Sequence, residues 1–506
     1  MNKKTEKSGI SRRAFLGTTA AAAAGFTIVP SNVIAGLGHV QPSDKLNIAG
    51  VGVGGMGNSN LRNLKSQNIV AWADVDWGYC KQNKIFENYP DAKPYKDWRK
   101  MYDEMGKSFD AVVVATADHT HATVAAHAMT MGKHVYVQKP LTHTVYESRL
   151  LTKLADKYKL ATQMGNQGSS GEGVNLVCEW LVNGEIGEVT KVEAFTDRPI
   201  WPQGLNRPEP GMWVPDTLDW DLFIGPAPMR PYHSLYTPWN WRGWWDFGTG
   251  ALGDMACHIL HPVFVGLELG YPTKAQGSST LLLNDCAPNA QMVKLTFPAR
   301  AAKRPWKGMK KGAALQQVEV TWYDGGLQPM KPAGWPEGKS MNDSGGGVIF
   351  HGTKDKLICG CYGVNPWLLS GRVPEAPKFR RRIDKATNGG HEMDWVRACK
   401  ESPETRVKTA SDFSEAGPFN EMVVMGVLAV RLQALNKELE WDGINMKFNN
   451  IGDAKIKTVV KDGFTIKDGH PTFAKDWTPE VNASDFAAEL IKHTYRKPWT
   501  LPDMPA

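Results

Sequence analysis

Short apolar runs alternate with helix-length amphipathic stretches in the first third of the chain. Five runs have the length and apolar content of strands that are buried on both faces of a parallel sheet. They are residues 48–51, 69–73, 110–116, 134–138 and 160–164. Residues 120–131 and 146–158 instead repeat apolar side chains at helical spacing. This alternation predicts an α/β fold with a doubly wound parallel sheet over residues 45–165.

The pattern changes after residue 165 to strand-like runs that are separated by loops. These runs are residues 189–195, 292–297, 317–323 and 348–351. They predict a second, α+β domain over residues 166–455, with a large and mainly antiparallel sheet. Asp324-Gly-Gly after the third run is typical of a hairpin turn. Residues 391–401 and 415–435 are expected to be helical, and the polar C-terminal extension, 456–506, gives no functional signal.

A glycine-rich turn stands where the first predicted strand ends. It reads Gly52-Val-Gly54-Gly-Met-Gly57, and the second predicted strand ends at Asp74, 17 residues after the last glycine. Gly52 permits the tight turn, Gly54 permits close approach of a pyrophosphate, and Gly57 lets the following helix pack on the strand. A glycine turn of this kind can be purely structural, but the flanking strands and the acid favour a Rossmann-type dinucleotide site.

The acid at the end of the second predicted strand indicates which dinucleotide is bound. The Asp74 carboxylate can accept hydrogen bonds from ribose hydroxyls, and Asp76 follows two residues later with no arginine beside it. Two carboxylates without a cation would repel a 2′-phosphate. We therefore expect NAD as the cofactor, and expect NADP to bind less well.

The first 35 residues have the pattern of a twin-arginine export signal. Lysines precede Ser11-Arg12-Arg13, an alanine-rich stretch follows, and Val33-Ile-Ala35 offers a cleavage site. The alternative is a basic disordered tail. Twin-arginine export carries folded proteins, so the interpretation predicts a periplasmic protein that is folded before it leaves the cytoplasm.

Charge and apolar content exclude two classes of partner. The formal net charge of the 506 residues is +7, but residues 1–35 hold five basic and one acidic side chain, which leaves +3 after their removal. A charge this small gives no reason to expect a nucleic acid partner. Beyond the leader, no run of 18 apolar residues indicates a stable membrane segment. The seven cysteines include no C-x-x-C pair, so no metal site is expected.

Two stretches of the first domain resemble the Gfo/Idh/MocA (glucose–fructose oxidoreductase/inositol dehydrogenase) family. They are residues 110–116 with His121, and Gly132-Lys-His-Val-Tyr-Val-Gln138-Lys139-Pro-Leu. In that family the second stretch usually reads G-K-H-V-x-x-E-K-P, and its lysine lies at the nicotinamide, which implies this position for Lys139. Ala117 replaces the usual proline, and Gln138 replaces the usual glutamate, which removes a charge near the lysine.

A second match lies in the predicted second domain. Asp254 and His258 are four residues apart, so they share one face of a helix, and His261 lies on the same side before Pro262. Alone, such a pair is often only a contact on a helix surface. The family signature G-G-x-x-x-D-x-x-x-H overlays Gly250, Asp254 and His258, with Thr249 in place of its first glycine.

The resemblance implies a set of site residues and roles. Lys139, Asp254 and His258 would be catalytic: His258 as general base, Asp254 orienting it, and Lys139 stabilising the developing alkoxide. The residues expected to bind the cofactor are Gly52, Gly54, Gly55, Met56, Gly57, Asp74, Thr116, His121, Gln138, Lys139 and Asn166. The family also places the two later helices against the nucleotide domain.

Tryptophans crowd the segment 197–246, which is rich in Pro and Gly and lacks periodicity. A long loop of this kind is usually functional, and indole faces stack on sugar rings. The other interpretation is that these rings fill a core beneath the loop. The residues expected to contact substrate are Trp241, Arg242, Trp244 and His261.

These patterns lead to one principal hypothesis and two alternatives. The chain is expected to be an exported NAD(P)-dependent oxidoreductase that moves hydride to or from a secondary hydroxyl of a sugar, glycoside or cyclitol. It would retain and recycle its own cofactor, because free nicotinamide is scarce outside the cytoplasm, and would form a dimer or tetramer. One alternative is an NAD-dependent glycosidase or lyase that oxidises a sugar transiently. The other is a non-catalytic sensor that binds a nucleotide or a sugar.

Overall fold

The computed structural model describes residues 44–309, 314–385 and 389–505. The predicted export signal, residues 1–35, lies outside this part of the chain. Residues 47–506 form a compact unit, which contains all of the helices and strands named below. Within the described ranges, no helix is both long enough and apolar enough to cross a bilayer.

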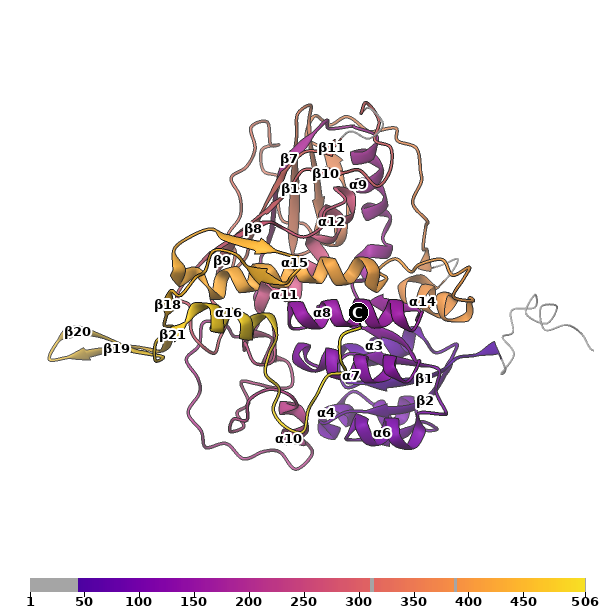
Figure 1. Cartoon of the computed structure of the whole chain (residues 1–506), viewed down its shortest axis with the longest axis vertical. Coiled ribbons are helices and arrows are strands. Elements are labelled where there is room, and N and C mark those ends of the chain that lie inside the picture. The colour runs from indigo at the N-terminus through magenta and orange to yellow at the C-terminus, as the bar shows by residue number, and fades with distance from the viewer. Residues whose placement is uncertain (1–43, 310–313, 386–388, 506) are drawn as a thin grey trace, which may run out of the picture. The chain divides into compact units, whose positions relative to one another are not determined.

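The first half of this unit is built on a six-stranded, fully parallel sheet (Figure 1). Its strands are β1 (Asn47–Val51), β2 (Asn68–Ala73), β3 (Lys93–Tyr95), β4 (Ala111–Val114), β5 (His134–Val137) and β6 (Thr162–Met164). The order is β3-β2-β1-β4-β5-β6, so the chain reverses direction across the sheet between β1 and β4. This doubly wound arrangement confirms the predicted class, and its reversal point is where such sheets bind ligands.

Helices cover both faces of this sheet. They are α3 (Met56–Asn63), α4 (Trp77–Gln82), α5 (Ile85–Asn88), α6 (Trp98–Met105), α7 (Asp118–Thr130) and α8 (Val145–Lys157). Local sequence explains where α8 begins, because Thr144 and Glu147 form a reciprocal capping box. β4 reads Ala-Val-Val-Val and is buried along its whole length, as a strand between two helical layers must be.

The second half contains a nine-stranded mixed sheet in the order β15-β14-β13-β7-β12-β9-β8-β16-β17. Its strands are β7 (Val189–Thr196), β8 (Lys274–Ser279), β9 (Gln291–Phe297), β12 (Val318–Tyr323), β13 (Gly346–Gly352), β14 (Lys356–Gly360), β15 (Trp367–Leu368), β16 (Leu439–Asp442) and β17 (Lys447–Phe448). Only β7 and β12 pair in parallel, and the other neighbours are antiparallel. The expected large and mainly antiparallel sheet is therefore confirmed.

The expected hairpin turn at Asp324 is wrong. β12 ends at Tyr323, but the next strand, β13, pairs with β7 and not with β12. Because β7 lies between them, the chain must cross over rather than turn back. Asp324 is instead fully buried and accepts hydrogen bonds from the backbone N–H of Gln291 and the indole of Trp322. A turn-like tripeptide gives no information on which strand comes next in the sheet.

Helices of the second half join the two sheets. They are α9 (Glu172–Val182), α10 (Trp220–Ile224), α11 (Gly250–Ile259), α12 (His261–Gly266), α14 (Gly390–Lys400), α15 (Phe413–Arg431) and α16 (Ala483–Ile491). The long α15 passes between the halves (Figure 1) and packs on α8, as the family resemblance implied. Pro262 lies in the first turn of α12, so the helical chain restarts there after α11.

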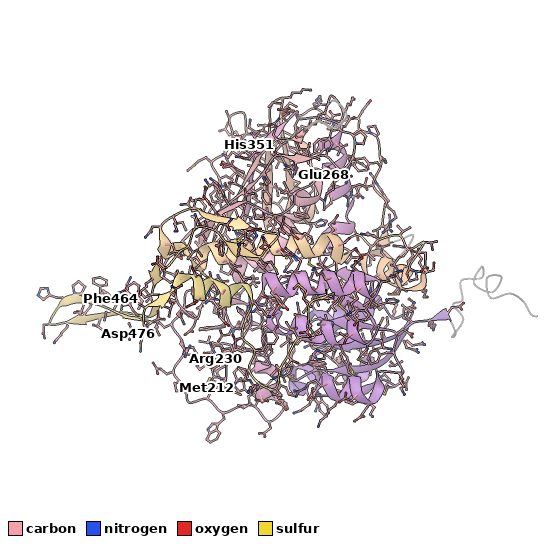
Figure 2. All side chains as sticks on the ribbon, in the orientation of Figure 1. Met212, Arg230, Glu268, His351, Phe464 and Asp476 are labelled. Carbon is pink, nitrogen blue, oxygen red and sulfur yellow. The ribbon has the colours of Figure 1, made fainter. Side chains whose placement is uncertain are left out.

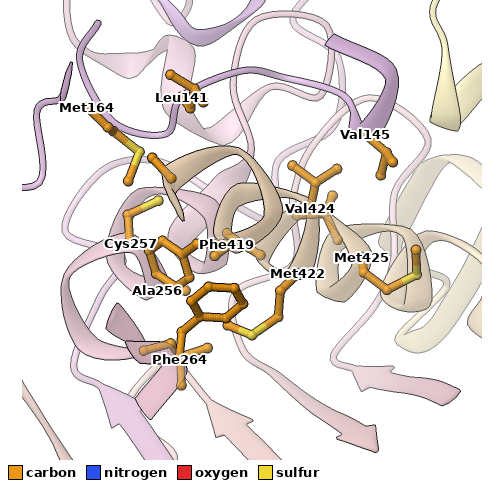
Figure 3. Packing of buried hydrophobic residues seen from close by; sticks show 14 of the residues in the cluster. Leu141, Val145, Met164, Ala256, Cys257, Phe264, Phe419, Met422, Val424 and Met425 are labelled. Atoms are coloured by element: carbon orange, nitrogen blue, oxygen red, sulfur yellow. The ribbon is translucent and has the colours of Figure 1, made fainter. Parts of the chain in front are cut away.

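The core around α15 holds the site's helices in place (Figure 3). Phe419 and Met422 face Phe264 and the residues of α11, and all three of these side chains are buried. Each large apolar side chain buried in this way contributes roughly 1.5–3 kcal/mol. A polar contact sets the register: the Asn420 amide accepts from the Leu141 backbone N–H and donates to the Ser148 hydroxyl.

Small strands and a strap complete the chain. The strands are β10 (Arg300–Ala301), β11 (Ala314–Leu315), β18 (Lys455–Ile456), β19 (Val459–Lys467), β20 (His470–Trp477) and β21 (Val481–Asn482). β19 and β20 form a hairpin that projects from the body, with Phe464 and Asp476 on it (Figure 2). After α16, residues 492–505 form a C-terminal strap. In the strap, Arg496 donates to the Asp221 carboxylate and the Gly225 carbonyl, and so fastens α10.

Candidate active site

The glycine turn has no room for side chains. Gly52 has a φ of +79°, and a Cβ there would lie 2.6 Å from the Ala115 backbone. A Cβ on Gly57 would lie 2.3 Å from the Gly52 carbonyl oxygen. The first strand, the turn and α3 are thus in close backbone contact, and Gly55 and Met56 at the start of α3 are exposed. This close-packed turn at the N-terminus of α3 therefore fits a dinucleotide pyrophosphate.

Asp74 lies beside the turn at the end of β2. Its carboxylate accepts from the Gly54 N–H at 2.8 Å and from the Asp76 N–H at 3.0 Å. Burial raises the pKa of Asp74, and these two hydrogen bonds oppose the rise. Asp76 caps α4 by accepting from the Tyr79 N–H. The two predicted carboxylates therefore stand at one edge of the sheet, where a ribose would be bound.

One cavity of about 650 Å³ runs from the glycine turn to the helix that carries the catalytic candidates. Its walls include Asp74, Thr116 and Lys139 from the parallel sheet, and Asp254 and His258 from α11. Lys139 and Asp254 are 115 residues apart in the sequence, yet the fold places them in contact. The remaining predicted cofactor residues on its walls are Gly52, Gly55, Met56 and Gln138.

Asp254 joins two cations in the cavity wall. Its Oδ1 accepts from Lys139 Nζ at 2.7 Å and from Arg242 Nε at 3.1 Å. Burial alone would raise the pKa of this carboxyl, but the charges of Lys139 and Arg242 hold it well below its usual range. Asp254 therefore stays ionised and keeps the lysine in place at the cavity surface.

His258 is buried one helical turn later, with its ring 4.6 Å from the ring of Tyr362. Burial, together with the charge of Lys139, lowers the pKa of His258 to about 3. The ring is thus neutral at ordinary pH and can accept a proton. In the described part of the chain, no hydrogen bond joins Asp254 to His258, and His258 Nδ1 has no partner. The expected orienting role of Asp254 is not what this geometry shows, because Lys139 and Arg242 occupy the carboxylate.

Besides Gly54 and Gly57 of the glycine turn, four predicted residues do not reach the cavity wall. The ring of His121 bonds the Pro140 and Thr116 carbonyls, and so supports the strand ends from behind. The Trp244 indole donates to the Leu235 carbonyl inside the loop core. His261 points to Glu415 at 3.2 Å, because the new helix after Leu260 rotates it away. Asn166 is buried with both side-chain polar atoms unpaired among the described residues.

Gln138 is held by a buried polar network. Its Nε2 donates to Asn60 Oδ1 at 2.8 Å, and Asn60 in turn donates to Glu392 Oε1 at 2.9 Å. Its Oε1 faces the Lys139 backbone N–H at 3.3 Å. The family's glutamate is thus replaced by an amide that is coupled, through Asn60, to a carboxylate on α14.

The tryptophans of the segment 197–246 divide between the two predicted roles. Those that line the cavity are Trp201, Trp239 and Trp241. Those that are buried in the core beneath the loop are Trp220, Trp244 and Trp245. Trp213 is 94 % exposed and does neither. Of the four expected substrate residues, Trp241 and Arg242 therefore lie on the cavity.

Among the cavity residues that were not predicted from the sequence are Tyr362 and Arg198. Tyr362 follows β14 with a φ of +63°, which brings its ring against His258. Arg198 follows β7 and lies on the same wall. No motif surrounds either residue. The only local signals are the nearby Cys359/Cys361 pair and the irregular loop that begins at Asp197. Among the described residues, no cluster of His, Cys, Asp or Glu could hold a metal ion.

Comparisons with known proteins agree with this architecture. A family model described as "Oxidoreductase family, NAD-binding Rossmann fold" (GFO_IDH_MocA) matches residues 46–166. A second, described as "Oxidoreductase family, C-terminal alpha/beta domain" (GFO_IDH_MocA_C2), matches residues 179–276. Together they cover the glycine turn, Lys139, Asp254 and His258.

The similar curated proteins are matched over part of their length. Inositol 2-dehydrogenase of Salmonella typhimurium is 26 % identical over 144 residues, which is 27 % of this chain and 42 % of that protein. A glycosyl hydrolase family 109 protein of Shewanella pealeana is 26 % identical over 207 residues, 37 % of this chain and 45 % of that protein. Levoglucosan dehydrogenase of Pseudarthrobacter phenanthrenivorans is 26 % identical over 164 residues, which is 32 % of this chain and 34 % of that protein. The chain thus spans less than half of each relative.

Solved structures show the same fold over a longer range. The WlbA dehydrogenase of Chromobacterium violaceum, in complex with NADH and UDP-GlcNAcA, gives a TM-score of 0.51 at 17 % identity, with 79 % of this chain and 96 % of that chain covered. Levoglucosan dehydrogenase with NADH and levoglucosan gives 0.50 at 16 % identity, with 78 % and 99 % covered. The chain therefore matches, in order, two domain models of the Gfo/Idh/MocA oxidoreductase family, the NAD-binding Rossmann fold over residues 46–166 and the C-terminal α/β domain over residues 179–276.

Proposed function

We propose that this protein is an NAD-dependent oxidoreductase that acts on a secondary hydroxyl of a sugar, glycoside or cyclitol. The observation that carries the proposal is the convergence of Lys139, Asp254 and His258 on the cavity that begins at the glycine turn. A non-catalytic sensor would not need a lysine held by a carboxylate beside a neutral, buried histidine. The curated dehydrogenases that resemble the chain act on compounds of this class by their names.

Each residue has a role that its surroundings support. His258 is neutral, so its ring can take the hydroxyl proton as the carbon is oxidised. Lys139 donates hydrogen bonds and stabilises the charge that develops on the substrate oxygen. Asp254 and Arg242 fix the position of Lys139. In the reverse direction, His258 returns the proton to the same oxygen.

The cofactor proposed is NAD. When bound, its nicotinamide supplies the acceptor for the hydride that leaves the substrate carbon. The backbone of the glycine turn would hold the pyrophosphate, and the Asp74 carboxylate would accept hydrogen bonds from the ribose hydroxyls. Asp74 and Asp76 stand where a 2′-phosphate would lie, and no arginine lies beside them in the sequence. Both features favour NAD over NADP.

A second candidate is a glycosidase or lyase that oxidises the sugar only transiently. The match with the glycosyl hydrolase family 109 protein, over 207 residues, favours it. In such a reaction the carbon next to the new carbonyl loses a proton, and the neighbouring C–O bond breaks, so that the aglycone leaves as an alcohol and a double bond remains. A glycosidase then adds water to this double bond, which a lyase does not, and the hydride returns at the end. The same three residues can serve both reactions, so only product analysis separates them.

We further propose that the protein is exported folded to the periplasm, that it retains its cofactor, and that it works as a dimer or tetramer. The support for export is the Ser11-Arg12-Arg13 motif. An enzyme that released reduced cofactor there would stop after one turnover. Retention is supported by the cover over the cavity: Trp239 and Trp241 line it, and Leu222 and Phe223 of α10 do so beneath the C-terminal strap.

The test begins with protein purified from the periplasm without added cofactor. After denaturation, the supernatant is assayed for nicotinamide dinucleotide, and native protein is incubated with a panel of sugars and glycosides while absorbance at the NADH band is followed. We expect stoichiometric NAD and a single-turnover signal with some sugars. Mass analysis of the products distinguishes a ketone from a cleaved glycoside. Protein that neither holds nor binds NAD would refute the function.

A further inference from the structure

The substrate end of the cavity carries more positive than negative charge. Lys139, Arg198 and Arg242 line it, whereas Asp254 is the carboxylate on that wall among the described residues. The other lining carboxylates, Asp74 and Asp76, belong to the end of β2. β2 and β5 are three strand positions apart in the sheet, so these acids lie roughly 14 Å away at about 4.8 Å per strand. They do not neutralise this end.

Arg242 is fixed in place with part of its fork unused. Its Nε donates to Asp254 and its Nη1 donates to the Trp239 carbonyl at 3.1 Å. Its guanidinium lies over the rings of Trp239 and Trp241, at 3.9 and 4.3 Å from their centroids. Nη2 has no hydrogen-bond partner in the described ranges. Lys139 already neutralises Asp254, so a second cation is not needed for that purpose.

Arg198 reaches the same wall from a different element. Its Nη1 pairs with Asp197, which also accepts from Asn342, while its Nε and Nη2 have no partner among the residues described. Arg198 follows β7 and Tyr362 follows β14 at the same end of the sheet, because Phe195 and Gly360 both pair with Gly347. Both residues line the cavity, so Arg198 belongs to the end where Tyr362 contacts His258.

We propose that the substrate carries an oxyanion, and that Arg198 and Arg242 bind it. The chemical class is a sugar with a carboxylate, as in a uronic acid, or with a sulfate ester. Two preoriented guanidinium groups with free N–H donors match the oxygens of either group, and the Trp faces beside them match the ring. This inference rests on the proposed oxidoreductase function and adds the substrate class. It also explains why a second cation, Arg242, stands beside Asp254, which Lys139 already neutralises.

A neutral substrate gives a different expectation for the same residues. Arg242 would then act only through Asp254, as a positioning residue for Lys139. Arg242→Lys separates the two roles, because a lysine keeps the charge near Asp254 but loses the fork that receives an oxyanion. Arg198 does not contact Asp254, so it reports on the oxyanion alone.

The test measures how tightly sugars bind to the NAD-loaded protein, with tryptophan fluorescence quenching and calorimetry as the two readouts. The probes are methyl glycosides in gluco, galacto and manno configuration, each as the neutral sugar, the uronic acid and the 6-sulfate. We expect one anionic series to bind about 10- to 100-fold more tightly than its neutral counterpart, the range of a charge-assisted hydrogen bond. Carboxylate or sulfate preference identifies the source of the anion.

The variants decide between the roles. Arg198→Gln, Arg242→Gln and Arg242→Lys should each reduce the preference for the anion at least about tenfold, while the exposed Arg62→Gln control should keep it. Equal binding of neutral and anionic sugars, no binding of any probe, or a preference that survives in the Arg198 and Arg242 variants would overturn the proposal. NAD binding and NADH formation with a neutral sugar would still support the oxidoreductase, so the two proposals fail separately.

Discussion

A methyl group added at Gly57 should separate the nucleotide turn from its helix. The new Cβ of Gly57→Ala would lie 2.3 Å from the Gly52 carbonyl oxygen and 3.3 Å from the Ala115 Cβ. Ordinary contact begins near about 3.5 Å, so roughly 1 Å of movement is required. The obstructing atom is backbone and cannot rotate away. α3 (Met56–Asn63) must therefore shift, at a cost of about 1–3 kcal/mol in the free energy of unfolding.

The shift also moves the N–H groups that would receive the pyrophosphate. Losing one such charge-assisted hydrogen bond weakens NAD about 10- to 100-fold. Calorimetric titration measures this, and thermal unfolding measures the stability. Gly270→Ala is the matched control, because nothing lies within 4 Å of a Cβ there. A Gly57→Ala protein with the affinity and melting temperature of the parent would refute the reasoning.

Three other predictions concern the chemistry. Lys139→Ala and His258→Ala should each lower kcat by about 10²-fold or more, while titrations should still show NAD binding. Normal turnover by the His258→Ala enzyme would make the Asp254/His258 pair merely structural. Because the pKa of His258 is lowered to about 3, its ring stays neutral on acidification, so kcat/KM should persist below the ordinary histidine pKa of about 6.5; a pH profile that falls with a midpoint there would contradict this. Asp74→Ala should narrow the preference for NAD, and tighter NADP binding by the parent protein would count against the ribose contact.

The parts of the site that belong to one local motif were visible in the sequence. The glycine turn and Asp74 follow from strand ends and spacing, and His258 follows from a helix position relative to Asp254. Their partners were less visible. The Asp254 carboxylate bonds Lys139 and Arg242, which come from distant parts of the sequence. The four-residue spacing between Asp254 and His258 could therefore not show whether these two side chains bond each other.

The rest depended on sheet order and on the position of each ring. Tyr362 reaches His258 only because β14 pairs with β13, which itself pairs with β7. The same crossover made the Asp324 turn misleading. Trp241 and Trp244 are three residues apart, yet the first lines the cavity and the second fills the core. Residue type is the same in both places, so composition could not separate them.

The strap sets an order of events during synthesis. Arg496 bonds Asp221 across 275 residues of sequence. At ordinary ribosome speeds, roughly 15 to 55 s pass between the emergence of these two partners. During that interval the parallel sheet is already complete, while α10, a wall of the cavity, still lacks its fastening. A dinucleotide that is retained as proposed above would therefore meet an unsecured wall in the nascent chain and a fastened wall in the finished chain, which separates loading from retention in time.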